Sequence, residues 1–442
     1  MAGPSKLRIL LIQVAREGPD GEVWRPARLW FHGLTLPYLA ALFDHRASVR
    51  TVDELVEPVP LDHDCDLVGI TFMGASLPRA LRLADQFRAR GRRVIAGGVT
   101  ASLYADEVLP HVDSLVVGDA EGLIDPLLDD FEKGTPKRVY RHARPPGLEA
   151  TPVPRYDQVA RSKVGPYYPV EATRGCSFGC GFCATSHFHG RVQRKKPVEN
   201  VLRDVAAIKS EGIRRVLFVD DNVTLDRRYF SELLEGLGGL GVRWTANATA
   251  DIARDEGLLD RMAASGCESV SIGFETLDQQ NLERAGKSRV TAADYPAAVR
   301  RLQERGIMVL AMFVLGLDGD GPEVFADVER FLVTNRIEMA LFHVLTPVRG
   351  TPLFDELARE GRMLDVDFAA HGADRAVFRP ARMSPGELDD GFWRLQRRFY
   401  SMGSILRRLV LVRPDAHYLR RLTAVAANLY FGHLARSKRL LI

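Results

Sequence analysis

The chain has 442 residues, of which 46% are hydrophobic and 26% are charged, and its formal net charge at pH 7 is +3. This composition is typical of a globular protein, and the length suits about three domains of roughly 150 residues each. No run approaches the roughly 18 consecutive apolar residues of a transmembrane helix. Because the net charge is small, it gives no argument for nucleic-acid binding, and no nucleic-acid partner is expected.

Residues 1–140 are expected to form a doubly wound, Rossmann-like α/β domain. Apolar runs of strand length alternate with a helical stretch near 36–43 and with a second helix around residues 80–87. Such alternation predicts a parallel sheet, and the ligands of these sheets bind beyond the carboxyl ends of the strands. The predicted strands are Leu7–Val14, Leu67–Phe72, Val94–Ala96 and Leu115–Val117.

Glycines and hydroxyl side chains follow three of these predicted strands. Glycine lets a ligand approach the backbone closely, and a hydroxyl group can hold a polar tail. The candidate ligand-binding residues of this domain are therefore Thr71, Ser76, Gly97, Gly98 and Gly118.

A proline-rich linker and a second α/β domain follow. Six prolines between residues 145 and 169 mark residues 141–167 as an extended connection. Residues 168–360 then contain six short apolar runs with helical patterns between them, which predicts a partial (β/α)6 barrel with its chemistry at the carboxyl ends of the strands. The six predicted strands are Pro169–Ala172, Arg215–Val219, Val242–Ala248, Glu268–Phe274, Ile307–Leu315 and Leu341–Leu345.

Three cysteines with the spacing C-x3-C-x2-C follow the first of these runs: Cys176, Cys180 and Cys183. Three thiolates on one short loop are soft metal ligands. Iron–sulfur clusters normally take four cysteines, so one iron would lack a protein ligand here. A Cys3His zinc site that uses His187 or His189 is the alternative. A disulfide between two of these cysteines is a further alternative, but it would leave the third cysteine unpaired.

Polar residues end three of the other predicted barrel strands. Asp220, Asp221 and Asn222 follow the second strand, Glu275 ends the fourth, and Gly316 ends the fifth. A carboxylate at such a position can accept hydrogen bonds from an ammonium group of a ligand. The alternative is that these residues only form turns and helix caps, which Asp and Asn favour.

The cysteine motif resembles the signature of the radical S-adenosylmethionine (SAM) enzymes, and the resemblance covers residues 168 to about 355. In that family the open iron of a 4Fe-4S cluster binds SAM, which is cleaved to a 5′-deoxyadenosyl radical. The resemblance implies that Cys176, Cys180 and Cys183 are the cluster ligands and that Phe182 and Gly316 lie near the adenine. It places Asp220, Asp221 or Asn222 at the SAM amino group, and Glu275 at the ribose.

The N-terminal domain resembles the cobalamin-binding domain that one large radical SAM class carries. Many cobalamin domains contain Asp-x-His-x-x-Gly, and nothing after the first strand matches it; Asp62-His63-Asp64 lies before the Leu67 run and lacks the glycine. In the radical SAM class cobalamin is then held without a histidine. The resemblance thus implies cobalamin as a cofactor, and a degenerate domain that shapes the substrate cavity is the alternative.

These features together imply a cobalamin-dependent radical SAM methyltransferase. It would methylate an unactivated carbon of a small molecule or natural product and take electrons from a donor such as flavodoxin or ferredoxin. Radical SAM cyclisation or rearrangement without methyl transfer is one alternative, and a non-enzymatic Fe–S and corrinoid sensor is another. The sequence does not identify the substrate, a catalytic residue or the oligomeric state.

Residues 361–442 are expected to form a helical extension. Ser384, Pro385 and Glu387 predict a helix start, with serine at the cap, proline in the first turn and glutamate beside it. From residue 404 onward there are eight Lys or Arg and one acid. This segment, with pairs such as Arg407-Arg408, predicts either a helical cap with solvated arginines or a basic membrane-binding surface.

Cysteine usage bears on the location of the protein. Cys65 and Cys267 are expected to be buried apolar residues without a ligand role. The run Leu7–Val14 lacks a cleavage site of the kind that ends an export signal. With an oxygen-sensitive type of cluster, these features predict the cytoplasm.

Overall fold

A computed structural model describes residues 6–18, 20–287, 290–411 and 418–439, with side chains of 418–421 left out. The chain divides into two compact units. The first contains Met1–Ala172 and Arg194–Val216, and the second contains Thr173–Gln193 and Leu217–Ile442. The finer division at residues 140, 167 and 360 stays a prediction. Across the described segments, no helix has the length and apolar character needed to span a membrane.

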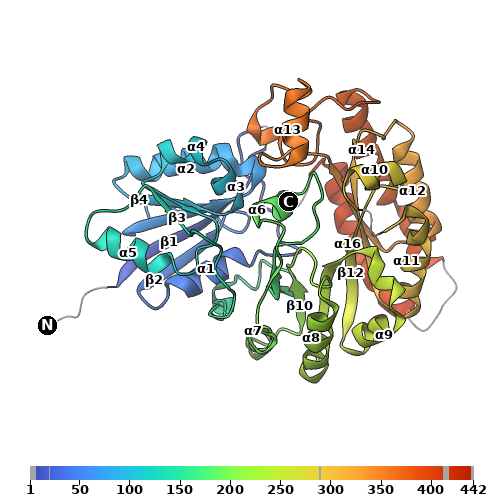
Figure 1. Cartoon of the computed structure of the whole chain (residues 1–442), viewed down its shortest axis with the longest axis horizontal. Helices are drawn as coiled ribbons and strands as arrows, with labels where there is room; N and C mark the ends of the chain where they lie inside the picture. The colour runs from blue at the N-terminus through green and yellow to red at the C-terminus, as the bar shows by residue number, and fades with distance from the viewer. Residues whose placement is uncertain (1–5, 19, 288–289, 412–417, 440–442) are drawn as a thin grey trace. The chain divides into compact units, whose positions relative to one another are not determined.

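The first unit contains a parallel six-stranded sheet in the order β2-β1-β3-β4-β5-β6. Helices α2, α3 and α4 lie on one side of the sheet, and α1 and α5 lie on the other (Figure 1). The strands are β1 (Leu7–Val14), β2 (Ala47–Asp53), β3 (Leu67–Phe72), β4 (Arg93–Gly97), β5 (Ser114–Val117) and β6 (Val139–Arg141). The helices are α1 (Thr35–Phe43), α2 (Leu77–Ala89), α3 (Val99–Leu103), α4 (Ala105–Val108) and α5 (Ile124–Glu132). The doubly wound α/β prediction is confirmed.

Apolar burial explains why these segments form this sheet. All six residues of β3 are buried, as expected for a parallel strand covered by helices on both faces. On one face, Leu36 and Phe43 of α1 and Leu127 of α5 belong to the same buried cluster as Ile9 and Leu11 of β1. Burial of a side chain of this size stabilises the fold by roughly 1.5–3 kcal/mol.

The second sheet is also six-stranded, in the order β7-β10-β11-β12-β13-β14, and its neighbouring strands from β11 onward are parallel. Helices follow its strands in alternation, which confirms the partial (β/α)6 barrel. The strands are β7 (Tyr167–Val170), β10 (Arg215–Phe218), β11 (Arg243–Ala248), β12 (Cys267–Glu275), β13 (Met308–Leu315) and β14 (Met339–Val344). The helices between them are α7 (Val198–Ser210), α8 (Arg227–Leu240), α9 (Glu256–Ala264), α10 (Gln279–Arg284), α11 (Tyr295–Glu304) and α12 (Val324–Thr334).

The C-terminal segment is helical, as predicted. After α13 (Pro352–Arg359), which lies before residue 361, it comprises α14 (Pro385–Phe399), α15 (Met402–Ile405), a π-helical turn (Leu406–Val410) and α16 (Tyr418–Arg436). The predicted start of α14 is confirmed: Ser384 and Glu387 form a reciprocal capping box.

The expectation of solvated arginines in this segment is wrong for Arg408. Its side chain is 0% exposed, and it donates hydrogen bonds to the backbone oxygens of Ile337, Glu338 and Phe399 and to Asn428 Oδ1. Burial lowers the pKa of Arg408 to about 10, so the guanidinium is charged at neutral pH. Because Ile337 and Glu338 directly precede β14, Arg408 joins the C-terminal helices to the amino end of that strand.

Candidate functional site

The three clustered cysteines lie on an irregular loop in the second unit. The loop runs from β8 (Thr173–Arg174) to α6 (Ala184–Phe188). Cys176 and Cys180 are buried and Cys183 is partly exposed. All five cysteines are free thiols, which excludes the disulfide alternative in this structure, and Cys65 and Cys267 are buried as predicted.

The surroundings of Cys176 and Cys180 favour the protonated form of these two thiols. Burial raises the pKa of Cys180 to about 11, and the Lys287 ammonium nearby opposes that increase. Burial also raises the pKa of Cys176, with Asp221 and Cys183 adding to the increase. Metal ligation requires the thiolate form, so loading of a metal here would release protons.

The donor set fits an iron–sulfur cluster better than a single metal ion. In the part of the chain that the structure describes, no group of three or more His, Cys, Asp or Glu residues is arranged to hold one metal ion, so the Cys3His zinc alternative has no support. In a 4Fe-4S cluster each thiolate binds a different iron, so its sulfurs need not converge on one point. Three thiols fit such a cluster and leave its fourth iron without a protein ligand.

Gly175 fixes the start of the cysteine loop. Its φ is +84°, and a Cβ there would clash with the backbone oxygen of Val192 and come within 2.9 Å of His189 Cβ. Both the backbone conformation and the close packing therefore require glycine. The chain that leaves α6 thus packs directly against the residue before Cys176.

A second segment, after α10, packs against the middle of the cysteine loop. A Cβ on Gly286, whose φ is +78°, would lie 3.2 Å from the backbone oxygen of Gly179 and 3.8 Å from Cys180 Cα. The Gly181 N–H donates to the oxygen of Ala285 (3.2 Å). These contacts hold the backbone around Cys180 against the segment that follows β12 and α10.

The two adjacent carboxylates after β10 have different surroundings. Asp220 is 2% exposed, and its Oδ1 accepts hydrogen bonds from the backbone N–H and the hydroxyl of Thr173. Asp221 is exposed and lies close enough to Cys176 for its charge to act on that thiol. Asn222 is buried and accepts from the N–H and the hydroxyl of Thr224. Asp220 and Asn222 thus shape the loop, whereas Asp221 faces outward.

Glu275 ends β12 in a strained conformation beside the cysteines. Its φ is +62°, which is rare for a residue other than glycine and is typical of functional sites. Its carboxylate forms an ion pair with Lys287, whose ammonium also donates to the oxygen of Gly273 (2.9 Å). Both partners affect the pKa of Cys180. Lys287 was not predicted from the sequence, because no motif marks a lysine 12 positions after Glu275.

Gly316 lies in a tight turn after β13. A Cβ on Gly316 would come within 2.7 Å of Leu388 of α14. The N–H groups of Gly316 and Leu317 donate to Asp320 Oδ2 (3.0 Å each), and Asn281 donates to Asp320 Oδ1 (2.9 Å). Burial raises the pKa of Asp320 to about 7. The buried carboxylate of Asp320 therefore holds this turn together through its hydrogen bonds, a role that was not predicted from the sequence.

Phe182 is partly exposed in the cysteine loop, between Cys180 and Cys183. Its backbone position places it beside the cluster ligands, as the motif implies. Its contact with an adenine stays a prediction.

In the first unit, the carboxyl ends of β3, β4 and β5 bring Thr71, Gly97, Gly98 and Gly118 to one edge of the sheet. A Cβ on Gly98 would come within 2.9 Å of Thr71 Oγ1, whereas a Cβ on Gly118 would meet nothing within 4 Å. Ser76, by contrast, is 6% exposed in the turn that precedes α2.

Two exposed apolar side chains lie at the same edge and were not predicted from the sequence. Met73 follows β3 and is 72% exposed, and Val99 follows β4 and is 41% exposed. Large apolar side chains facing solvent beside an open glycine edge are typical of a binding surface.

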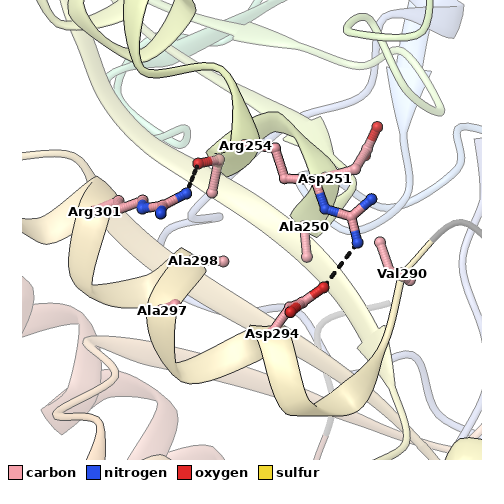
Figure 2. Close-up of a pocket in the computed structure, with 9 residues that line it drawn as sticks. Ala250, Asp251, Arg254, Val290, Asp294, Ala297, Ala298 and Arg301 are labelled. Carbon is pink, nitrogen blue, oxygen red and sulfur yellow. Dashed lines mark hydrogen bonds and ion pairs between the residues drawn. The ribbon is translucent and has the colours of Figure 1, made fainter.

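A pocket of about 250 Å³ lies in the second unit between the short helix Ala250–Arg254 and α11 (Figure 2). Arg254 and Asp294 form an ion pair across it (2.7 Å), and Arg301 donates to the oxygen of Ala253 (2.8 Å). None of the predicted site residues lines this pocket, so it is separate from the site around the cysteines.

Comparison with known proteins identifies the family. Residues 170–332 match the Radical SAM superfamily. The bacteriochlorophyllide d C-12(1)-methyltransferase of Chlorobaculum tepidum is 31% identical over 385 residues, which are 85% of this chain and 84% of the relative. An anaerobic magnesium-protoporphyrin IX monomethyl ester cyclase of Cereibacter sphaeroides is 25% identical over 402 residues, 82% of this chain and 63% of the relative.

A solved structure has the same fold. The radical SAM methyltransferase TsrM from Kitasatospora setae, solved with cobalamin and a [4Fe-4S] cluster bound, matches 98% of this chain and 99% of its own with a TM-score of 0.67 and 17% identity. The superfamily match over residues 170–332 and the 31% identical relative confirm the family resemblance that the cysteine spacing carries, and the chain belongs to the radical SAM superfamily of enzymes.

Proposed function

We propose that this enzyme is a cobalamin-dependent radical SAM methyltransferase that methylates an unactivated carbon of a small molecule or natural product. The observation that carries the proposal is the 31% identity, over 85% of the chain, to a methyltransferase. When bound, the cluster and SAM supply a carbon-centred radical that removes a hydrogen atom from the substrate, and cobalamin supplies a methyl group. A 25% identity to a cyclase supports the cyclisation alternative less strongly.

Residues of the second unit support the cluster and SAM sites. Cys176, Cys180 and Cys183 would hold three irons and leave the fourth for SAM. Asp221, exposed and close to Cys176, is the carboxylate proposed to accept hydrogen bonds from the SAM ammonium, whereas Asp220 is buried and accepts from Thr173. Glu275, which forms an ion pair with Lys287, is proposed to accept hydrogen bonds from the ribose hydroxyls.

The strand order of the first unit supports a cobalamin site. In the related flavodoxin-like order 2-1-3-4-5, ligands bind beyond the carboxyl ends of the strands at the switch point of the sheet. Here that edge carries Gly98, Gly118 and the exposed apolar side chains of Met73 and Val99. An apolar edge with Gly118 open to solvent fits a large, flat cofactor, which would be held without a histidine ligand from an Asp-x-His-x-x-Gly motif.

The test is reconstitution of the full chain without oxygen, with iron, sulfide, cobalamin and methyl-labelled SAM. We expect cluster and corrinoid absorption together, reductant-dependent formation of 5′-deoxyadenosine, and transfer of the label to cobalamin. Cys180→Ala is the control, which should lose the cluster and all SAM cleavage.

Two outcomes would contradict the proposal. SAM cleavage without any corrinoid binding would favour a cobalamin-independent rearrangement or oxidation. Binding of both cofactors without SAM cleavage would favour the sensor alternative. Because none of these measurements needs the substrate, they can precede its identification. The cytoplasmic location and a flavodoxin or ferredoxin donor complete the proposal, while binding to a membrane surface stays a prediction of the basic C-terminal segment.

A further inference from the structure

The strands β12 to β14 present two chemically different faces. On one face, Phe313 of β13 packs against Phe331 of α12 (6.0 Å between ring centroids), and Phe342 of β14 packs against Phe399 of α14 (5.7 Å). Successive side chains of a strand point to opposite faces. The residues that alternate with these phenylalanines therefore form the inner face of the barrel, away from the helices.

Within the residues that the structure describes, most of this inner face keeps partial solvent exposure. In β13 the helix-facing residues Val309, Ala311, Phe313 and Leu315 are each 0% exposed. Of the alternating inner residues, Leu310, Met312 and Val314 keep partial exposure, whereas Met308 packs against the buried cluster of Ile405, Leu409 and Ala424. The same alternation runs through β14. Because a packed interior buries both faces of a central strand, the partial exposure indicates that the inner face borders open space.

The inner face divides into a polar and an apolar half. On β12 the inner residues are Ser269, Ser271 and Glu275, and the Ser269 hydroxyl shares a hydrogen bond with Thr245 of β11 (2.8 Å). This half adjoins the residues proposed to bind SAM. On β13 and β14 the inner residues are apolar, apart from one histidine: Leu310, Met312, Val314, Leu341 and His343.

His343 lies at the carboxyl end of this apolar half. It is paired in register with Val314, the last inner residue of β13, so it belongs to the level at which barrel enzymes place their chemistry. Its imidazole makes no hydrogen bond or ion pair with any residue in the described ranges. Burial lowers the pKa of His343, against a smaller opposing effect of Glu275, which favours the neutral form of its imidazole. A neutral imidazole without a protein partner can both donate and accept a hydrogen bond.

We propose that the inner face of β13 and β14 receives the substrate, that the substrate has a largely apolar body, and that His343 binds a polar substituent of it, such as a carbonyl. This inference rests on the proposed function and names the substrate class for the same site. A flexible methionine such as Met312 suits such a face, because its side chain adapts to irregular shapes. His343 is thus assigned as a substrate-binding residue.

Two fluorescent probes that differ by one acceptor test the proposal: pyrene and 1-acetylpyrene. Each is titrated into the full chain reconstituted with cluster and SAM. We expect the wild type to bind 1-acetylpyrene about fivefold more tightly than pyrene, which is the effect of one hydrogen bond. His343→Phe should bind pyrene but lose that preference. Leu341→Lys should weaken the binding of both probes by on the order of tenfold or more, because it places a charge on the apolar face.

Met402→Lys is the matched control, since Met402 is 56% exposed on the C-terminal helices; it should bind both probes like the wild type. If Leu341→Lys lowers the melting temperature strongly, Leu341→Asn replaces it. Equal binding by the wild type and the Leu341 variant, or a preference that survives in His343→Phe, would overturn the inference. A wild-type chain that cleaves SAM but fails these tests would leave the proposed function standing, whereas failure of SAM cleavage would count against that function alone.

Discussion

Replacing Gly175 by alanine tests whether the cysteine loop is held in place by the packing around its first residue. The left-handed conformation at φ +84° costs a residue with a Cβ roughly 1–2 kcal/mol. The added methyl group would also press against the Val192 oxygen and His189 Cβ, and overpacking of this kind typically costs about 1–3 kcal/mol. Together these effects predict that Gly175→Ala destabilises the second unit by about 2–5 kcal/mol.

The assay has two readouts. Thermal unfolding of the cluster-free chain should show a melting temperature roughly 5–15 °C lower for the second unit of Gly175→Ala. Anaerobic reconstitution should give clearly less iron and sulfide per chain, because the loop must move to accept the methyl group and Cys176 is the next residue.

Gly181→Ala is the control from the same loop. A Cβ at Gly181 would meet nothing within 4 Å, and its φ is not in the left-handed region, so both readouts should stay close to those of the wild type. If Gly175→Ala loaded a full cluster and melted like Gly181→Ala, the reasoning from close packing would be refuted.

Three further predictions concern single side chains. Asp221→Ala should keep the cluster but weaken SAM binding roughly tenfold to a hundredfold in equilibrium dialysis, because a charge-assisted hydrogen bond is lost; unchanged affinity would move that role to Asp220 or Asn222. Arg408→Met should lower the melting temperature by the equivalent of roughly 3–5 kcal/mol, since it leaves buried acceptors unpaired; an unchanged melting temperature would contradict the structure of the C-terminal helices. Iodoacetamide at pH 8 should modify Cys180 about 100-fold more slowly in the folded cluster-free chain than in urea. The reason is that burial raises the pKa of Cys180 from 9.0 to about 11 and so lowers the fraction of thiolate, which is the reactive form. Equal modification rates, measured by peptide mass spectrometry, would refute this prediction.

The sequence predicted the strands that are buried on both faces. Leu7–Val14 and Leu67–Phe72 have the bounds that the apolar runs indicate, because a parallel strand between two helical layers tolerates few polar residues. Ala47–Asp53 was not predicted. It lies at one end of the sheet, pairs only with β1, and contains the polar residues Ser48, Arg50 and Thr51, so it lacks a continuous apolar run.

The site could be predicted only where its chemistry is local in the sequence. The three cysteines lie within eight positions, so their spacing alone indicated a cluster. The neighbours Asp220 and Asp221 look equivalent in the sequence, but in the loop after β10 one is buried against Thr173 and the other is exposed. Lys287 reaches the cysteines through the segment after α10, which is a tertiary contact that no spacing rule reveals.

The C-terminal helices have a consequence for the barrel as a folding unit. An incomplete barrel leaves a free edge, and an uncovered strand edge is a template for pairing with another chain. The side of β14 away from β13 is covered by other parts of the same chain. The Tyr400 hydroxyl donates to the Ala340 oxygen (2.5 Å), and the Val344 N–H donates to the Ala373 oxygen (2.8 Å). Arg408 donates to the backbone oxygens just before the strand. A chain cut before Ser384 would lose the first and third of these contacts. It should therefore aggregate through β14 rather than fold as a smaller enzyme.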